Sequence, residues 1–223
     1  MTLLRQIQNL LERTYTPTGI NLEDFLIGRQ RCTELTHLAG PMARDLSVDG
    51  RTFLRVINGH LYIAIYYHPW VIQILEQHPP FAELSGKNIR ALIVFLEELN
   101  HAVHAALRFL EHRLQIESES LMCDLELQAK VDTYLSLKLI GTALRKRRRL
   151  TKKHERWLQS CLFKSESFQY QHGVLRYRYR ETNRLALRLA RHLDQLKPSR
   201  RIAFIRQFRP LSFEQKRACI QSL

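Results

Sequence analysis

The stretch that decides the predicted fold is residues 42–67, which read MARDLSV-DG-RTFLRVI-NG-HLYIAIYY. Three runs with strand-like composition are separated by the dipeptides Asp49-Gly50 and Asn58-Gly59. Either dipeptide favours a two-residue hairpin turn, because both central residues of that turn take positive φ. Two such turns in succession predict a three-stranded antiparallel meander.

Helical periodicity surrounds this segment on both sides. Two helices are expected before it, one carrying the apolar residues of positions 3–11 and one capped by Asn21, with an apolar face of Leu22, Phe25, Leu26, Leu35 and Leu38. After it, apolar spacing predicts helices at about 69–77, 88–113, 119–141, 151–163, 174–196 and 213–221. The sequence therefore predicts an α+β fold with two N-terminal helices, a small three-stranded antiparallel meander, a mostly helical core and a helical extension.

Charge divides the chain into two regions. The 223 residues carry a net charge of +14. Residues 144–223 hold 22 Lys or Arg and 5 acids, whereas residues 1–143 hold 13 bases and 16 acids. We therefore expect an α+β core at 1–143 and a basic helical extension at 144–223 packed on that core.

Composition also indicates the cellular compartment of the protein and the classes of protein to which it does not belong. The four cysteines form no CxxC pair, which favours a reducing, cytoplasmic compartment over a disulfide framework. No apolar run reaches the roughly 18 residues that a membrane span needs, so no integral membrane segment is expected. A Gly-rich phosphate loop and a Gly-x-Ser-x-Gly elbow are both absent from the sequence, so neither nucleotide hydrolysis nor serine esterase chemistry is supported.

The strongest candidate for chemistry is the segment 91–104, ALIVFLEELNHAVH. Ionisable side chains inside an apolar helix are costly unless they are paired or bind a metal ion. Glu97, His101 and His104 are spaced i, i+4 and i+7 and share one helix face, while Glu98 lies about 100° away. Glu97 and His101 are therefore placed to bind one ion together.

The sequence EELNH at 97–101 resembles the HExxH helix of zinc metallopeptidases, with Glu in place of the first zinc-binding His. The resemblance implies that Glu98 is the general base and His101 a metal ligand. In the gluzincin class the third ligand is a Glu on the next helix, and Glu126, within ELQA, is similar to that position. The resemblance covers roughly residues 20–140 and implies a zincin-like core that hydrolyses amide or ester bonds, with the metal held by Glu97, His101 and Glu126.

The substitution at Glu97 changes the expected metal chemistry. A site with two carboxylates and one imidazole acidifies bound water less than two imidazoles and one carboxylate, and it favours Mn²⁺ or Fe²⁺ relative to Zn²⁺. One alternative is a vestigial scaffold in which the buried Glu and His side chains bond to one another. Another is a di-iron site, since Glu34-x-x-His37 and Glu98-x-x-His101 are two Glu-x-x-His motifs.

A ridge of arginines on the predicted helix 174–196 points to a polyanion partner. Its members are Arg176, Arg180, Arg184, Arg188 and Arg191. Their spacings of four, four, four and three residues place them on one helix face, opposite Leu185, Leu189, Leu193 and Leu196. Arg147, Arg148 and Arg149 extend the cationic character, and Tyr177 and Tyr179 beside the ridge are expected to stack on bases. Such a surface suits nucleic acid, an acidic protein or a membrane surface, and a non-enzymatic protein that binds nucleic acid or an acidic partner is the alternative to the hydrolase.

Overall fold

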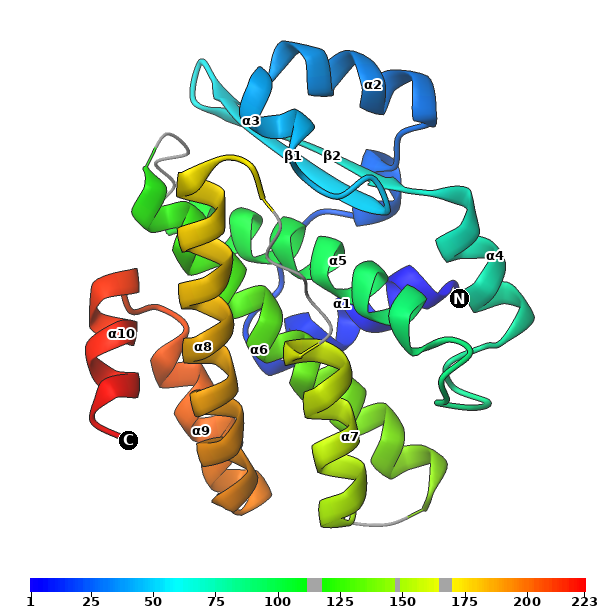
Figure 1. The fold of residues 1–223 in the computed structure, drawn as a ribbon, viewed down its shortest axis with the longest axis vertical. Coiled ribbons are helices and arrows are strands. Elements are labelled where there is room, and N and C mark those ends of the chain that lie inside the picture. The colour runs from blue at the N-terminus through cyan, green and yellow to red at the C-terminus, as the bar shows by residue number, and fades with distance from the viewer. Residues whose placement is uncertain (112–117, 147–148, 165–169) are drawn as a thin grey trace.

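The computed structural model describes residues 1–111, 118–146, 149–164 and 170–223, and it is mostly helical with one small antiparallel sheet (Figure 1). The elements before the longest helices are α1 (Leu3–Thr14), the 3-10 helix η1 (Leu22–Phe25), α2 (Arg29–Leu38), α3 (Pro41–Arg44), β1 (Gly50–Ile57), β2 (His60–Tyr67) and α4 (Pro69–Gln77). They are followed by α5 (Ile89–Leu110), α6 (Glu119–Leu144), α7 (Lys152–Phe163), α8 (Gly173–Gln195), α9 (Pro198–Phe208) and α10 (Phe213–Gln221).

The hairpin of β1 and β2 confirms one of the two predicted turns. The strands pair from Gly50 opposite Tyr67 to Ile57 opposite His60. Asn58 and Gly59 connect them with φ of 50° and 75°. Both residues thus take the positive φ that a two-residue hairpin turn of this kind requires.

The third predicted strand is wrong. Only two strands are found in the described residues, and the segment before β1 begins with the short helix α3, which has Pro41 in its first turn. Gly50 has no positive φ and pairs within β1 instead of forming a turn. A Cβ at this position would lie 2.6 Å from Val94 Cγ1 and 2.8 Å from Glu98 Cγ. Gly50 therefore allows the hairpin to approach α5 closely, a packing role that the Asp-Gly pattern does not reveal.

The second N-terminal helix is also shorter than predicted. Instead of one helix from Asn21, the chain forms η1 and then α2, separated at residues 26–28. There the Ile27 amide donates to the Ile65 carbonyl at 2.9 Å, and Leu26 forms an isolated parallel bridge with Ile65. The side chains of Leu26 and Leu38 are largely exposed. Pairing with β2 therefore interrupts the helix at residues 26–28. The predicted apolar face is also incomplete, because Leu26 and Leu38 do not reach the core.

The core lies around α5 and α6, which pack side by side. Their fully buried side chains include Leu96, Leu99, Leu127, Val131 and Tyr134. The hairpin covers one side of α5, and α8 runs along α6 on another side (Figure 1). The helices predicted after the hairpin are found within a few residues of their expected bounds. The prediction missed α9, in which Pro198 starts the helix instead of only ending the previous one.

A buried ion cluster joins the extension to the rest of the chain. Asp124 on α6 lies 2.6 Å from Arg108 Nη2 on α5 and 2.7 Å from Lys216 Nζ on α10. Lys216 also donates to Gln128 Oε1 at 2.8 Å and is completely buried. Burial lowers the pKa of Lys216 to about 8, although Asp124 opposes this effect. One carboxylate therefore lies between two cations that are almost completely buried.

None of the described helices has the length and apolar composition of a membrane span.

Candidate functional site

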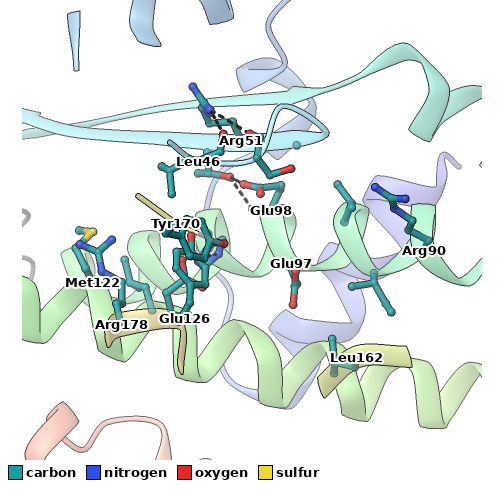
Figure 2. A pocket seen from close by; sticks show the side chains of 18 of the residues that line it. Leu46, Arg51, Arg90, Glu97, Glu98, Met122, Glu126, Leu162, Tyr170 and Arg178 are labelled. Carbon is teal, nitrogen blue, oxygen red and sulfur yellow. Dashed lines mark hydrogen bonds and ion pairs between the residues drawn. The ribbon is translucent and has the colours of Figure 1, made fainter. Parts of the chain in front are cut away.

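A cleft of about 670 Å³ lies between β1 and the helices α5, α6, α7 and α8. This volume falls within the range of pockets that bind small molecules. It is lined by all four residues of the predicted catalytic and metal site: Glu97, Glu98, His101 and Glu126. Figure 2 shows Glu98 pointing toward β1 and Glu97 pointing toward α6. The tight contact of Gly50 with α5 sets this edge of the cleft.

Glu98 is a carboxyl group held in place but poorly solvated. The Thr52 hydroxyl donates to Glu98 Oε2 at 2.7 Å and lies 3.0 Å from the Glu98 carbonyl oxygen. The pKa of Glu98 is raised to about 7, mainly by burial and also by the nearby Glu126 carboxylate, and this value includes the opposing effect of the hydrogen bond from Thr52. The residue keeps partial access to the cleft. Glu98 can therefore both take up and release a proton near neutral pH.

His101 and Glu126 form a pair across the two central helices. His101 Nε2 lies 3.7 Å from Glu126 Oε1, and both side chains are mostly buried. The Tyr179 hydroxyl of α8 donates to Glu126, and burial together with the Glu126 charge raises the pKa of Tyr179 well above its ordinary value. Tyr179 is stacked on Tyr170, with ring centroids 4.5 Å apart. The Glu126 carboxylate is thus fixed from two sides.

Glu97 has a different environment. Its Oε1 lies 3.4 Å from Nζ of Lys130, which is almost completely buried on α6. The predicted ligand Glu97 thus faces a cation, whereas His101 and Glu126 face each other. Across the described ranges, no three His, Cys, Asp or Glu side chains are grouped so that they could hold a metal ion. The structure thus brings two of the three predicted ligands into contact and pairs the other with lysine.

His104 does not contribute to this cleft. Its Nε2 lies 2.6 Å from Asp132 Oδ2, and both residues are buried. The Tyr15 hydroxyl donates to the same carboxylate at 2.7 Å. Burial lowers the pKa of His104, although Asp132 opposes this. His104 is therefore a core histidine with a carboxylate partner.

The di-iron alternative is wrong. Glu34 and His37 are exposed on α2, where Glu34 pairs with Arg31 at 2.9 Å. The hairpin lies between α2 and α5, so the two Glu-x-x-His motifs are on opposite sides of the sheet (Figure 1). They cannot share a metal centre in this arrangement.

Three residues that shape the site are not assigned to it by sequence reasoning: Thr52, Lys130 and Tyr179. The sequence does contain a signal for the position of Thr52, because strand alternation places it on the same face of β1 as Gly50 and Leu54. Lys130 follows Glu126 at i+4 but carries no motif. The run RYRYR predicts a base-stacking role for Tyr179, whereas the structure buries this side chain and places its hydroxyl against Glu126, about 50 residues away in sequence.

The arginine ridge is solvent-facing, as the helical spacing predicts. Its five members, Arg176, Arg180, Arg184, Arg188 and Arg191, are all exposed. On the opposite side of α8, Leu185, Leu189 and Leu193 are buried, and Leu196 is partly buried. Arg149 is exposed, whereas Arg147 and Arg148 lie outside the described residues.

Comparisons of this chain with models of known protein families, with curated proteins and with solved structures found no match.

Proposed function

We propose that the cleft is the active site of a hydrolase for amide or ester bonds, with Glu98 as the general base and His101 and Glu126 as the residues that bind a divalent ion. The observation that carries this proposal is the juxtaposition of a proton-accepting carboxyl with a histidine–carboxylate pair in one open cleft. The resemblance of residues 97–101 to the metallopeptidase helix supports the same assignment of Glu98 and His101.

The fit of a divalent ion follows from the charges in the cleft. Glu98 and Glu126 repel each other, and an added cation would relieve this repulsion. Imidazole and carboxylate ligands suit Mn²⁺, Fe²⁺ and Zn²⁺. Glu97 is left out of the ligand set, because the Lys130 ammonium neutralises it and would repel an ion beside it. When bound, the ion would polarise the scissile carbonyl and acidify a nearby water.

The protein residues then have distinct roles. Glu98 accepts a proton from the attacking water and returns it to the leaving amine or alcohol, which a carboxyl with a pKa of about 7 can do in both directions. Thr52 fixes the orientation of this carboxyl through its hydroxyl. Tyr179 fixes Glu126 in the same way from the other side of the cleft.

Metal retention tests the ligand assignment. The protein is dialysed against Mn²⁺ or Zn²⁺, freed of unbound ion and analysed for metal content. We expect about one ion for each chain, and loss of the ion in His101→Ala and Glu126→Gln. A matched control is His78→Ala, since His78 Nδ1 lies 2.8 Å from Glu83 Oε1 in a histidine–glutamate pair that does not line the cleft. If the wild type retains no metal, or if the control loses as much as the cleft variants, the ligand assignment is wrong.

Activity tests the role of Glu98. The metal-loaded protein is assayed with a chromogenic ester and with a fluorogenic peptide. We expect the rate to rise with pH as the Glu98 carboxyl loses its proton, with a midpoint below about 7, because the bound cation stabilises the ionised carboxylate relative to the metal-free protein. Glu98→Gln should lower the rate by at least about 100-fold, the usual effect of losing a general base. Undiminished hydrolysis by Glu98→Gln would rule out this role.

A further inference from the structure

The outer face of α8 carries a concentration of positive charge that internal carboxylates do not neutralise. Within the described residues, only Arg184 of the five ridge arginines has an acidic partner, Glu181 on the same helix. Arg176 donates to the Tyr170 carbonyl and Arg188 to the Gln221 carbonyl.

Arg180 and Arg191 complete this face. Neither forms an ion pair or a side-chain hydrogen bond with any part of the chain that the structure describes, and both are exposed. The acidic excess of residues 1–143 is therefore not used to neutralise the ridge. An external anion remains the available source of compensating charge.

The ridge also contains an exposed aromatic ring. Tyr177 precedes Arg180 by three residues and Arg184 by seven, so helical geometry places it on the same face. Its side chain is 55% exposed, in contrast to the buried Tyr134 of the core. Guanidinium groups bind phosphate in a bidentate manner, and an exposed aromatic ring stacks on an unpaired base. An acidic protein partner would use the arginines but would not require the ring.

We propose that the outer face of α8 binds single-stranded nucleic acid, with the ridge arginines on the phosphates and Tyr177 stacked on a base. From Arg176 to Arg191 the helix rises about 22 Å, a length along which a strand places several phosphates. Recognition is largely independent of base sequence, because backbone phosphates and ring stacking carry no sequence code. This binding surface is separate from the hydrolytic cleft and does not depend on its chemistry.

Fluorescence anisotropy with labelled oligothymidylate and oligouridylate, at several salt concentrations, tests the proposal. The charge variant is the double substitution Arg180→Glu and Arg191→Glu, because both side chains are exposed and, within the described ranges, neither makes an ion pair or side-chain hydrogen bond whose loss would affect folding. Its matched control is Arg29→Glu with Arg55→Glu, two exposed arginines outside the extension with the same change in net charge. Circular dichroism establishes that all variants are folded.

We expect salt-dependent binding by the wild type. Loss of two phosphate contacts should lower the slope of log K against log salt by about 1.4. The control should keep the wild-type slope. If the wild type does not bind either oligonucleotide, or if the control weakens binding as much as the ridge variant, the proposal is overturned.

The stacking part has its own matched pair. Tyr177→Ala should weaken binding at least about fivefold while leaving the salt slope unchanged. The control is Tyr62→Ala, because Tyr62 lies on β2 and is 54% exposed, nearly as much as Tyr177. Equal affinity of Tyr177→Ala and wild type, or tighter binding to a duplex than to the single strand, would contradict a single-stranded ligand.

Discussion

Replacement of Glu98 by Gln should stabilise the folded protein at neutral pH while abolishing hydrolysis. Glutamine keeps a carbonyl oxygen that can accept the hydrogen bond from Thr52, and it has nearly the same shape as glutamate. It carries no charge into the poorly solvated side of the cleft. The substitution thus removes the cost of ionising Glu98 and leaves the packing intact.

The magnitude follows from the pKa of Glu98. Folding raises this pKa from 4.5 to about 7. Between these values the folded state holds its proton while the unfolded chain has lost it, so the contribution of this group to stability falls as pH rises. One pKa unit corresponds to about 1.4 kcal/mol. Above pH 7, where Glu98 is ionised in both states, this rise in pKa therefore lowers the free energy of unfolding by about 3 kcal/mol. Water in the cleft screens part of it, so we expect a gain of about 1–3 kcal/mol for Glu98→Gln at pH 8.

Urea denaturation at pH 4.5 and pH 8 measures this effect. The midpoint of Glu98→Gln should exceed that of the wild type at pH 8 and approach it at pH 4.5, with the same dependence on urea concentration. Glu76→Gln, an exposed residue of α4, is the control and should show no difference at either pH. A variant less stable than the wild type at pH 8, or a difference that does not change with pH, would refute the reasoning.

Two further substitutions test the packing around the site. Gly50→Ala places a methyl group 2.6 Å from Val94 and should cost about 1–3 kcal/mol in urea denaturation, whereas Gly86→Ala, which meets no atom within 4 Å, should cost far less. Asp124→Ala removes the carboxylate that Arg108 and Lys216 share inside the protein. It should lower the free energy of unfolding by about 3–5 kcal/mol, measured in the same way. In contrast, Glu34→Ala breaks an exposed ion pair and should leave the midpoint unchanged. Equal midpoints within either pair would contradict the packing described here.

The fold could be predicted where local pattern and tertiary packing agree. The long helices α5, α6 and α8 have continuous apolar spacing, and their bounds follow from it within a few residues. The hairpin turn at Asn58-Gly59 could also be predicted, because both residues tolerate positive φ. The role of Asp49-Gly50 could not be predicted, because Gly50 is required by a close contact with α5, more than 40 residues away in sequence.

The site could be predicted only in part for a related reason. Helical geometry separates Glu97 from Glu98 and places Glu97 with His101, and this much requires no tertiary information. Which of these carboxylates acquires a cationic partner depends on Lys130, located on another helix. A spacing rule identifies residues that share a helix face, but it does not say which group on the facing helix will meet them.

The division of the chain by charge does not separate its parts in space. Tyr179 of the basic extension donates to Glu126 in the cleft, and Lys216 binds Asp124 on the same helix α6. In both contacts the extension supplies the hydrogen-bond donor and the core supplies the carboxylate. The inner face of the extension is therefore matched to acids of α6, while the outward arginines of α8 retain their charge. One polypeptide region can in this way complete the proposed active site on one side and bind an anionic partner on the other.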